Sequence, residues 1–388
     1  MMLVLKNGRV LTMAGREFVG DVAVENGKIA ALGENLDFPG AQVRDVTGCY
    51  VMPGIVDAHS HIGMWEDGMG REGADGNECT NPVTPELRAI DAINPYDRCF
   101  EEACAAGVTT CVTGPGSANV IGGQFVALKT YGSSVEDMTL RFPVAVKGAF
   151  GENPKRVYES LKQTPQTRMA TAAVMRKALV EAQEYNKKLE EGKADPSKMP
   201  ERNLAKEMLA KVIRRELPMK LHAHRADDIL TAIRICKEFN LRFTLDHCTE
   251  GYLIPDELKR AITEQGAGII IGPLLSDRSK IELKNLSFKA PKVLFDAGIT
   301  FAMMTDHPVI PAQYLPVCAA LSVREGLPEE EALRSITINA ARISAIDDRV
   351  GSLEVGKDAD VAVFSGHPLD FRSRCKLTLI NGLVAHEE

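Results

Sequence analysis

The chain has 388 residues, of which 45% are hydrophobic and 26% charged, and this composition excludes disordered, collagenous and membrane-embedded classes of protein. A formal net charge of −7 offers no basic surface for a phosphate backbone, so no nucleic-acid partner is expected. The first apolar run is broken by Lys6, Asn7 and Arg9, and no run reaches the roughly 18 apolar residues of a membrane helix, which predicts a cytoplasmic protein with no membrane partner.

The first 50 residues are predicted to form β-structure. Asn-Gly pairs at 7–8 and 26–27 stand between short apolar runs, and this dipeptide is the strongest local signal for a two-residue hairpin. A third Asn-Gly pair, at 381–382, follows a further predicted strand near the other end of the chain. We therefore predict one small β domain built from residues 1–50 and 346–388.

Between these ends, short apolar runs alternate with helical patterns, which predicts an α/β domain of repeated β/α units with a parallel sheet over residues 51–345. Strands are predicted at 51–56, 108–112, 142–149, 219–221, 242–245, 268–271 and 299–304. Helices are predicted at 95–106, 167–189, 201–217, 227–239, 255–265 and 315–325. An eighth strand is needed to close a barrel, and by elimination we assign it to 124–131.

Histidine is rare in the chain, yet four of its eight residues fall into two His-X-His triplets, His59-Ser60-His61 and His222-Ala223-His224. Alternate residues of a strand face the same side, so each triplet can direct two imidazoles into the mouth of a barrel. His247 and Asp306 also follow predicted strands, at the end where barrel enzymes carry their catalytic groups. Because imidazole is a common ligand of zinc-like ions, the pattern predicts a metal site.

The chain carries several short motifs whose order along the sequence is specific enough to indicate a family. PGIVDAHSH at 53–61, LDH at 245–247, TD at 305–306 and GSLEVGKDAD at 351–360, with His222 between them, resemble the amidohydrolase superfamily over nearly the whole chain. The nearest members are imidazolonepropionase-like and prolidase-like metal-dependent hydrolases. The resemblance implies a (β/α)8 TIM barrel, a small discontinuous β-sandwich domain formed by both termini, and hydrolysis at a carbon attached to nitrogen.

The same resemblance implies the metal ligands: His59 and His61 at the first barrel strand, His222 at the fifth, His247 at the sixth and Asp306 at the eighth. Lys147, carboxylated on its amine, resembles the residue that bridges two ions in many relatives, and Glu152 is the alternative. A carbamate and a carboxylate are both hard anionic oxygen donors, so either can join two cations. We expect a divalent metal, with zinc favoured, and the sequence leaves open whether one ion or two are bound.

The mechanism follows from this ligand set. A divalent ion lowers the pKa of bound water and polarises the scissile carbonyl. Asp306, beside the metal, is predicted to take the water proton as general base and to return it to the leaving nitrogen as general acid.

Candidate substrate contacts lie on predicted loops and comprise Trp65, Asn119, Gln124, His224, Arg225 and Arg278. The segment 63–94 carries the only Trp of the chain and is predicted to fold over the mouth as a lid. Backbone amides of the Gly-rich segment 114–124 could approach a ligand closely. The two arginines could clamp a carboxylate with paired hydrogen bonds, and His224, which has no fixed role in the resemblance, could orient substrate or support a ligand.

The predicted activity is hydrolysis of an amide, lactam or peptide-like C–N bond in a small-molecule substrate. Deamination of an aminated ring compound is an alternative, because the same activated water can attack either kind of carbon. A non-catalytic barrel is a further alternative, against which the full set of expected ligands argues. The resemblance alone suggests a homo-oligomer.

Overall fold

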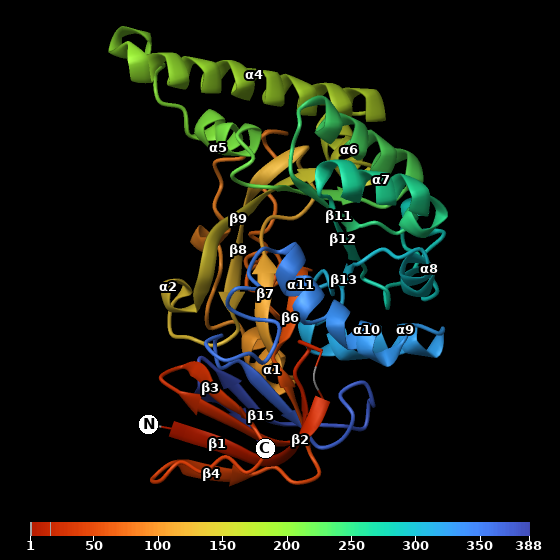
Figure 1. Cartoon of the computed structure of the whole chain (residues 1–388). Helices are drawn as coiled ribbons and strands as arrows, with labels where there is room; N and C mark the ends of the chain where they lie inside the picture. Colours follow the sequence, from red (N-terminus) through yellow and green to blue (C-terminus); the bar gives the residue numbers. More distant parts are fainter. Residues whose placement is uncertain (1, 16) are drawn as a thin grey trace.

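The computed structural model describes residues 2–15 and 17–388, which form two separate sheets (Figure 1). One sheet curves into a barrel, and the other is built from both ends of the chain. The labelled N- and C-termini lie on the terminal sheet, at the opposite end of the molecule from α4 (Arg168–Ala194). The predicted fold class is confirmed, while Met1 and Arg16 of the predicted terminal domain lie outside the described residues.

The barrel sheet has the order β13-β12-β11-β10-β9-β8-β7-β6. Its strands are β6 (Ile55–Ser60), β7 (Val108–Thr113), β8 (Ile121–Lys129), β9 (Thr139–Ala149), β10 (Met219–Ala223), β11 (Phe243–His247), β12 (Gly268–Ile271) and β13 (Ala302–Met303). Two backbone hydrogen bonds join the first strand to the segment after the last: Asp306 N–H donates to the carbonyl of His59 (3.1 Å), and His61 N–H donates to that of His307 (2.9 Å). The barrel is therefore nearly closed at the ends of these strands.

The strand predicted at 124–131 is present as β8, but it runs antiparallel to both of its neighbours. The other paired strands of the barrel are parallel. Only residues 114–120 connect β7 to β8, whereas a parallel crossover needs about a dozen residues or more. The expected unbroken parallel repeat was wrong at this position, because the connection is too short to carry the chain back to the other end of the sheet.

The strand predicted at 51–56 divides between the two sheets. β5 (Tyr50–Pro53) pairs with terminal strands, and β6 then begins the barrel. Gly54 lies between them, and a Cβ at this residue would lie 2.0 Å from Thr109 Oγ1. Because only glycine allows so close an approach to β7, Gly54 marks the point where the chain passes from one sheet to the other.

The terminal sheet confirms two of the three predicted Asn-Gly hairpins. Its remaining strands are β1 (Met2–Leu11), β2 (Glu17–Glu25), β3 (Lys28–Gly33), β4 (Gln42–Asp45), β14 (Val361–Phe364), β15 (Cys375–Ile380) and β16 (Leu383–Glu387). The pairs at 26–27 and 381–382 join β2 to β3 and β15 to β16, with positive φ at both residues as in a type I′ turn. The hairpin predicted at 7–8 is wrong: β1 continues through it with a bulge, because both halves of β1 pair with β2.

All six predicted helices are present, as α1, α4, α5, α6, α7 and α9, with ends that differ from the predictions by a few residues. The helices other than α4 are α1 (Arg98–Ala105), α2 (Val135–Met138), α3 (Glu152–Ser160), α5 (Leu204–Ile213), α6 (Ala226–Glu238), α7 (Pro255–Gln265), α8 (Ala290–Asp296), α9 (Leu315–Arg324), α10 (Glu329–Ser335) and α11 (Ile338–Ile343). Short 3-10 helices are η1 (Ala89–Asp91), η2 (Pro196–Lys198), η3 (Gly251–Leu253), η4 (Ile281–Leu283) and η5 (Ala312–Tyr314). Within the described ranges, no helix is long and apolar enough to cross a membrane.

A buried ion cluster joins the terminal sheet to the barrel. Lys129, at the end of β8, is 2% exposed, and its Nζ donates to Asp358 (3.0 Å) and to Asp360. Both aspartates immediately precede β14, and Asp358 also pairs with Lys28 and Arg349. A buried charge that loses its partner remains desolvated without compensation. The cluster is therefore expected to hold the two sheets together.

We predict that Lys129→Met lowers the free energy of unfolding by about 3–5 kcal/mol, because it removes the cation paired with the buried Asp360, whereas Asp358 keeps Lys28 and Arg349. Denaturation by urea, followed by circular dichroism, measures this loss. Lys193→Ala is the control, since Lys193 is 67% exposed and pairs with Glu190 on the surface of α4, where a pair contributes about 1 kcal/mol or less. Equal effects of the two substitutions would contradict the assigned role of Lys129.

Candidate metal centre

The predicted ligands lie together at the carboxyl ends of the barrel strands. His59 is in β6 and His61 follows it, while His222 is in β10 and His247 ends β11. Asp306 follows β13 and its side chain is 14% exposed, whereas the four imidazoles are buried. The structure thus brings side chains from four strands to one mouth of the barrel.

His59 is oriented by an ionised carboxylate. Its Nδ1 lies 2.6 Å from Asp246 Oδ2, so this nitrogen carries the ring proton and donates it. Lys220 Nζ lies 3.2 Å from the same oxygen. Burial opposes ionisation of Asp246, but Lys220 and His59 hold its pKa far below the usual range. Burial lowers the pKa of His59 to about 3, so Nε2 of this neutral ring is an unprotonated acceptor.

His61 faces a second carboxylate. Its Nδ1 lies 2.6 Å from the carbonyl oxygen of Gly114 and must donate to it. Its Nε2 lies 3.1 Å from Asp306 Oδ1, which is buried and has no hydrogen-bond partner among the residues described. Although burial raises the pKa of Asp306, the nearby imidazoles of His61 and His59 and the amine of Lys147 bring it below its usual range. Two acceptors at this separation repel each other unless a proton or a metal cation lies between them.

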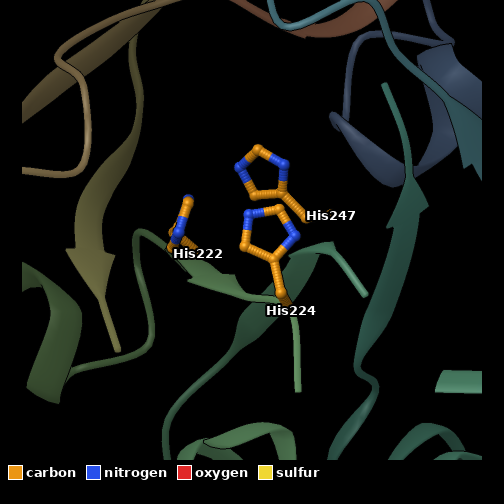
Figure 2. A group of neighbouring side chains, drawn as sticks. All are labelled: His222, His224 and His247. Carbon is orange, nitrogen blue, oxygen red and sulfur yellow. The ribbon is translucent and has the colours of Figure 1, made fainter. Parts of the chain in front are cut away.

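A second group of imidazoles comprises His222, His224 and His247, whose ligand nitrogens lie within 4.8 Å of one another. Figure 2 shows the three rings gathered at the ends of β10 and β11. His247 Nδ1 donates to the carbonyl of Gly272 (3.1 Å), and His224 Nδ1 lies 2.7 Å from Thr249 Oγ1. In the described part of the chain, neither nitrogen of His222 has a hydrogen-bond partner. Burial lowers the pKa of all three rings, to about 3 for His224, so they are neutral and able to bind a metal.

Both groups have the donor chemistry of a divalent metal site. His59, His61 and Asp306 also place their ligand atoms within 4.8 Å of one another. Zinc takes imidazole nitrogen and carboxylate oxygen at roughly 2.0–2.2 Å, and a cation would satisfy the unpartnered Oδ1 of Asp306 and the unpartnered ring of His222. The residues present therefore fit a divalent cation at each group.

The two predicted bridging residues lie in different surroundings. Lys147, in β9, is fully buried, and its Nζ lies 3.2 Å from His59 Nε2. Burial lowers the pKa of Lys147 to about 8, against the opposing effect of nearby carboxylates. Glu152 is the half-buried first residue of α3 and belongs to neither ligand group. Lys147 is therefore the better placed of the two to contact a metal.

Three charged residues beside the imidazoles were not predicted from the sequence to belong to the site: Asp246, Lys220 and Glu282. Asp246 stands within the LDH motif, and Lys220 precedes His222 by two residues on the same strand face, so motif and alternation carried a signal for both. Glu282 lies in η4, where no motif marks it. Burial opposes ionisation of Glu282, but His222 and His224 hold its pKa at about 2.

The predicted substrate contacts divide into two sets. Trp65 and His224 lie beside candidate ligands: the Trp65 ring is centred 5.0 Å from that of His61, and His224 belongs to the second imidazole group. The other four side chains bind protein partners: Asn119 binds Thr84 and Tyr158, Gln124 binds the carbonyls of Pro85 and Glu86, Arg225 binds Asp227, and Arg278 binds the carbonyl of Leu286. These hydrogen bonds tie the second set to neighbouring protein groups, and a substrate contact by any of the four stays a prediction.

Comparison with known proteins supports the predicted family. The amidohydrolase family model matches residues 50–384. A crystal structure of an amidohydrolase from Thermotoga maritima MSB8 is 44% identical with a TM-score of 0.96, and the match covers 100% of both chains. Amidohydrolase tasK of Hapsidospora irregularis is 29% identical over 91% of this chain, which spans only 38% of that protein. The 5-methylthioadenosine/S-adenosylhomocysteine deaminase of Desulforudis audaxviator (strain MP104C) is 25% identical over 94% of this chain and 85% of its own.

We predict that Asp246→Asn weakens metal binding by roughly 10–100-fold, the usual effect of losing a carboxylate that orients a ligating imidazole. Competition with a chelator measures the dissociation constant. Asp227→Asn is the control, because Asp227 is 52% exposed and pairs with Arg225 outside the two ligand groups. If folded Asp246→Asn protein binds metal as tightly as the unmodified chain, the orienting role is wrong.

Proposed function

This chain belongs to the amidohydrolase family, and on that premise we propose that it is a metal-dependent hydrolase that cleaves an amide, lactam or peptide-like C–N bond in a small molecule. The main support for this proposal is the contact between His61 and Asp306. His61 Nε2 and Asp306 Oδ1 face each other at 3.1 Å while His61 Nδ1 is committed to the carbonyl of Gly114. A metal cation between these two atoms would satisfy both of them.

A divalent cation held by His59, His61 and Asp306 would supply an activated water and polarise the scissile carbonyl. Asp306 is our candidate for proton transfer, because its side chain is partly exposed toward the mouth and Oδ1 has no partner among the described residues. It would accept a proton from water and deliver it to the leaving nitrogen. His59 and His61 each commit Nδ1 to another acceptor, so they suit ligand roles better than proton transfer.

The segment 63–94 is proposed to cover the substrate and exclude water. Trp65 lies against His61 and forms a β-bridge with Ala74 in the same segment. Gln124 of β8 donates to the carbonyls of Pro85 and Glu86. These contacts hold the segment beside the mouth, and a covered site favours a small-molecule substrate over a macromolecule.

We further propose zinc as the metal, with one ion at each ligand group and a carboxylated Lys147 between them. Neutral imidazoles combined with a carboxylate are donors that zinc accepts. Lys147 supports the proposal by its position, since its buried amine lies 3.2 Å from His59 Nε2. A carbamate on this amine would add anionic oxygen to a region rich in neutral nitrogen ligands.

Carboxylation of Lys147 predicts a carbamate carbon resonance in protein equilibrated with 13C-labelled bicarbonate. The signal should disappear in Lys147→Gln. It should persist in Lys280→Gln, a matched control whose amine is bound to Asn153 at 2.9 Å. Absence of the resonance in the unmodified, metal-loaded protein would mean that Lys147 acts as an amine.

Deamination is a second candidate activity, favoured by the similarity to the deaminase of Desulforudis audaxviator (strain MP104C). Attack by an activated water on an aminated ring carbon uses the same metal and the same proton carrier as amide hydrolysis. The two activities differ in their products. Hydrolysis of a lactam or peptide-like bond yields a new carboxylate, whereas deamination of a ring yields ammonia and no carboxylate.

We predict that Asp306→Asn lowers kcat by about 10²–10⁴-fold through loss of the proton carrier. The assay uses metal-loaded protein and a panel of lactams, dipeptides, amides and aminated rings, with carboxylate and ammonia measured separately. Asp348→Asn is the control, because Asp348 is 60% exposed and pairs with Arg141 at the surface. Full turnover after removal of all metal would contradict both candidate activities.

A further inference from the structure

Glu282 presents a buried carboxylate to the second imidazole group. It lies in η4, on the connection between β12 and α8, and its side chain is 1% exposed. Its Oε1 lies 3.8 Å from His222 Nε2 and 3.7 Å from His224 Nε2, and it has no hydrogen-bond partner in residues 2–15 and 17–388. A carboxylate oxygen and two ring nitrogens therefore face one another without a direct bond.

The other oxygen of Glu282 is anchored to the start of α3. Oε2 accepts a hydrogen bond from the backbone N–H of Glu152 at 3.0 Å. A Cβ at Gly151, which precedes this helix with φ of +84°, would lie 2.7 Å from Oε2. A side chain at this residue would have to displace the carboxylate, and its positive φ also favours glycine. The anchor holds the side chain so that Oε1, and not Oε2, faces the imidazoles.

The separations suit a shared cation better than a direct interaction. At 3.7 and 3.8 Å, Oε1 is too far from either imidazole for a hydrogen bond. Two ligand atoms that each lie about 2.1 Å from one zinc ion can be up to about 4.2 Å apart. The geometry is therefore compatible with a metal between the carboxylate and the two rings.

Among the described residues, no Lys or Arg side chain pairs directly with this carboxylate. Arg168 binds Asp228, and Lys280 donates to Asn153. In the chain as described, no Lys or Arg nitrogen lies within 4.0 Å of Glu282. A buried anion without a paired charge is costly, and this cost adds to the case for a bound cation.

We propose that Glu282 is a metal ligand for a zinc-like divalent ion at the second imidazole group, where its Oε1 faces His222 and His224. The inference rests on the proposed metal-dependent function and extends it. The family resemblance gives no role to Glu282 and no fixed role to His224. Glu282 and the three imidazoles are distinct from His59, His61 and Asp306, and Glu282 would add an anionic oxygen to the second ion beside the one proposed from Lys147.

The test compares Glu282→Gln with Glu250→Gln in the full chain, stripped of metal and titrated with zinc against a chelator. Glu250 is a matched control, because it is also buried near the mouth but both of its oxygens have partners, the N–H of Ala226 and the amide of Asn285. We expect two bound ions in the unmodified and Glu250→Gln proteins. In Glu282→Gln, one ion should keep its affinity and the other should bind more than about 100-fold less tightly, exceeding the effect of losing an orienting group.

Anomalous scattering from zinc-loaded crystals of the unmodified chain supplies a second measurement that does not depend on a variant folding. An ion about 2.0–2.2 Å from Glu282 Oε1 supports the proposal. Absence of an ion at that oxygen, or unchanged affinities in folded Glu282→Gln protein, overturns it while the proposed hydrolase function stands. A chain that binds no metal at all would overturn both.

Discussion

The candidate site depends on one constraint, the commitment of imidazole Nδ1 atoms to acceptors in the barrel. Asp246 and two backbone carbonyls hold the rings of His59, His61 and His247 in this way. Because a neutral ring carries one proton, each bond leaves an unprotonated Nε2 for a metal. Burial keeps the rings of His59 and His247 neutral by lowering their pKa values. If these bonds were absent, the rings could rotate or exchange tautomers, and the convergence of acceptors would be lost.

Closure of the barrel uses the same residues. The backbone bonds from Asp306 to His59 and from His61 to His307 join the first and last strands at the ligand positions. Closure of the barrel therefore positions His59, His61 and Asp306 relative to one another. The terminal sheet supports this arrangement from outside, where Lys129 is buried between Asp358 and Asp360. Backbone hydrogen bonds and charge pairing thus fix the candidate site at the mouth of the barrel.

Local patterns predicted most elements, because a strand or helix is marked by the spacing of its own apolar residues. These predictions failed where the course of a strand depended on a neighbouring strand or on the length of a connection. β1 continues through its Asn-Gly pair because β2 is long enough to pair with both halves, and β8 reverses direction because its connection is short. The candidate ligands were predictable for a similar reason, since the two His-X-His triplets and Asp306 follow recognisable strands. Glu282 belongs to an irregular loop, where periodicity carries no information about which way a side chain faces.

The sequence by itself predicted the family and the α/β barrel with its terminal sheet, and it supplied the candidate ligands, because ordered motifs, residue type and short-range spacing carry this information. Only the tertiary structure decided which side chains and backbone carbonyls orient the candidate ligands. The bond between His59 and Asp246 joins residues 187 positions apart, and Glu282 reaches His222 from a different strand connection. Such contacts arise when the barrel closes and desolvates its mouth, since burial makes each unpaired charge or lone pair costly enough to require a partner.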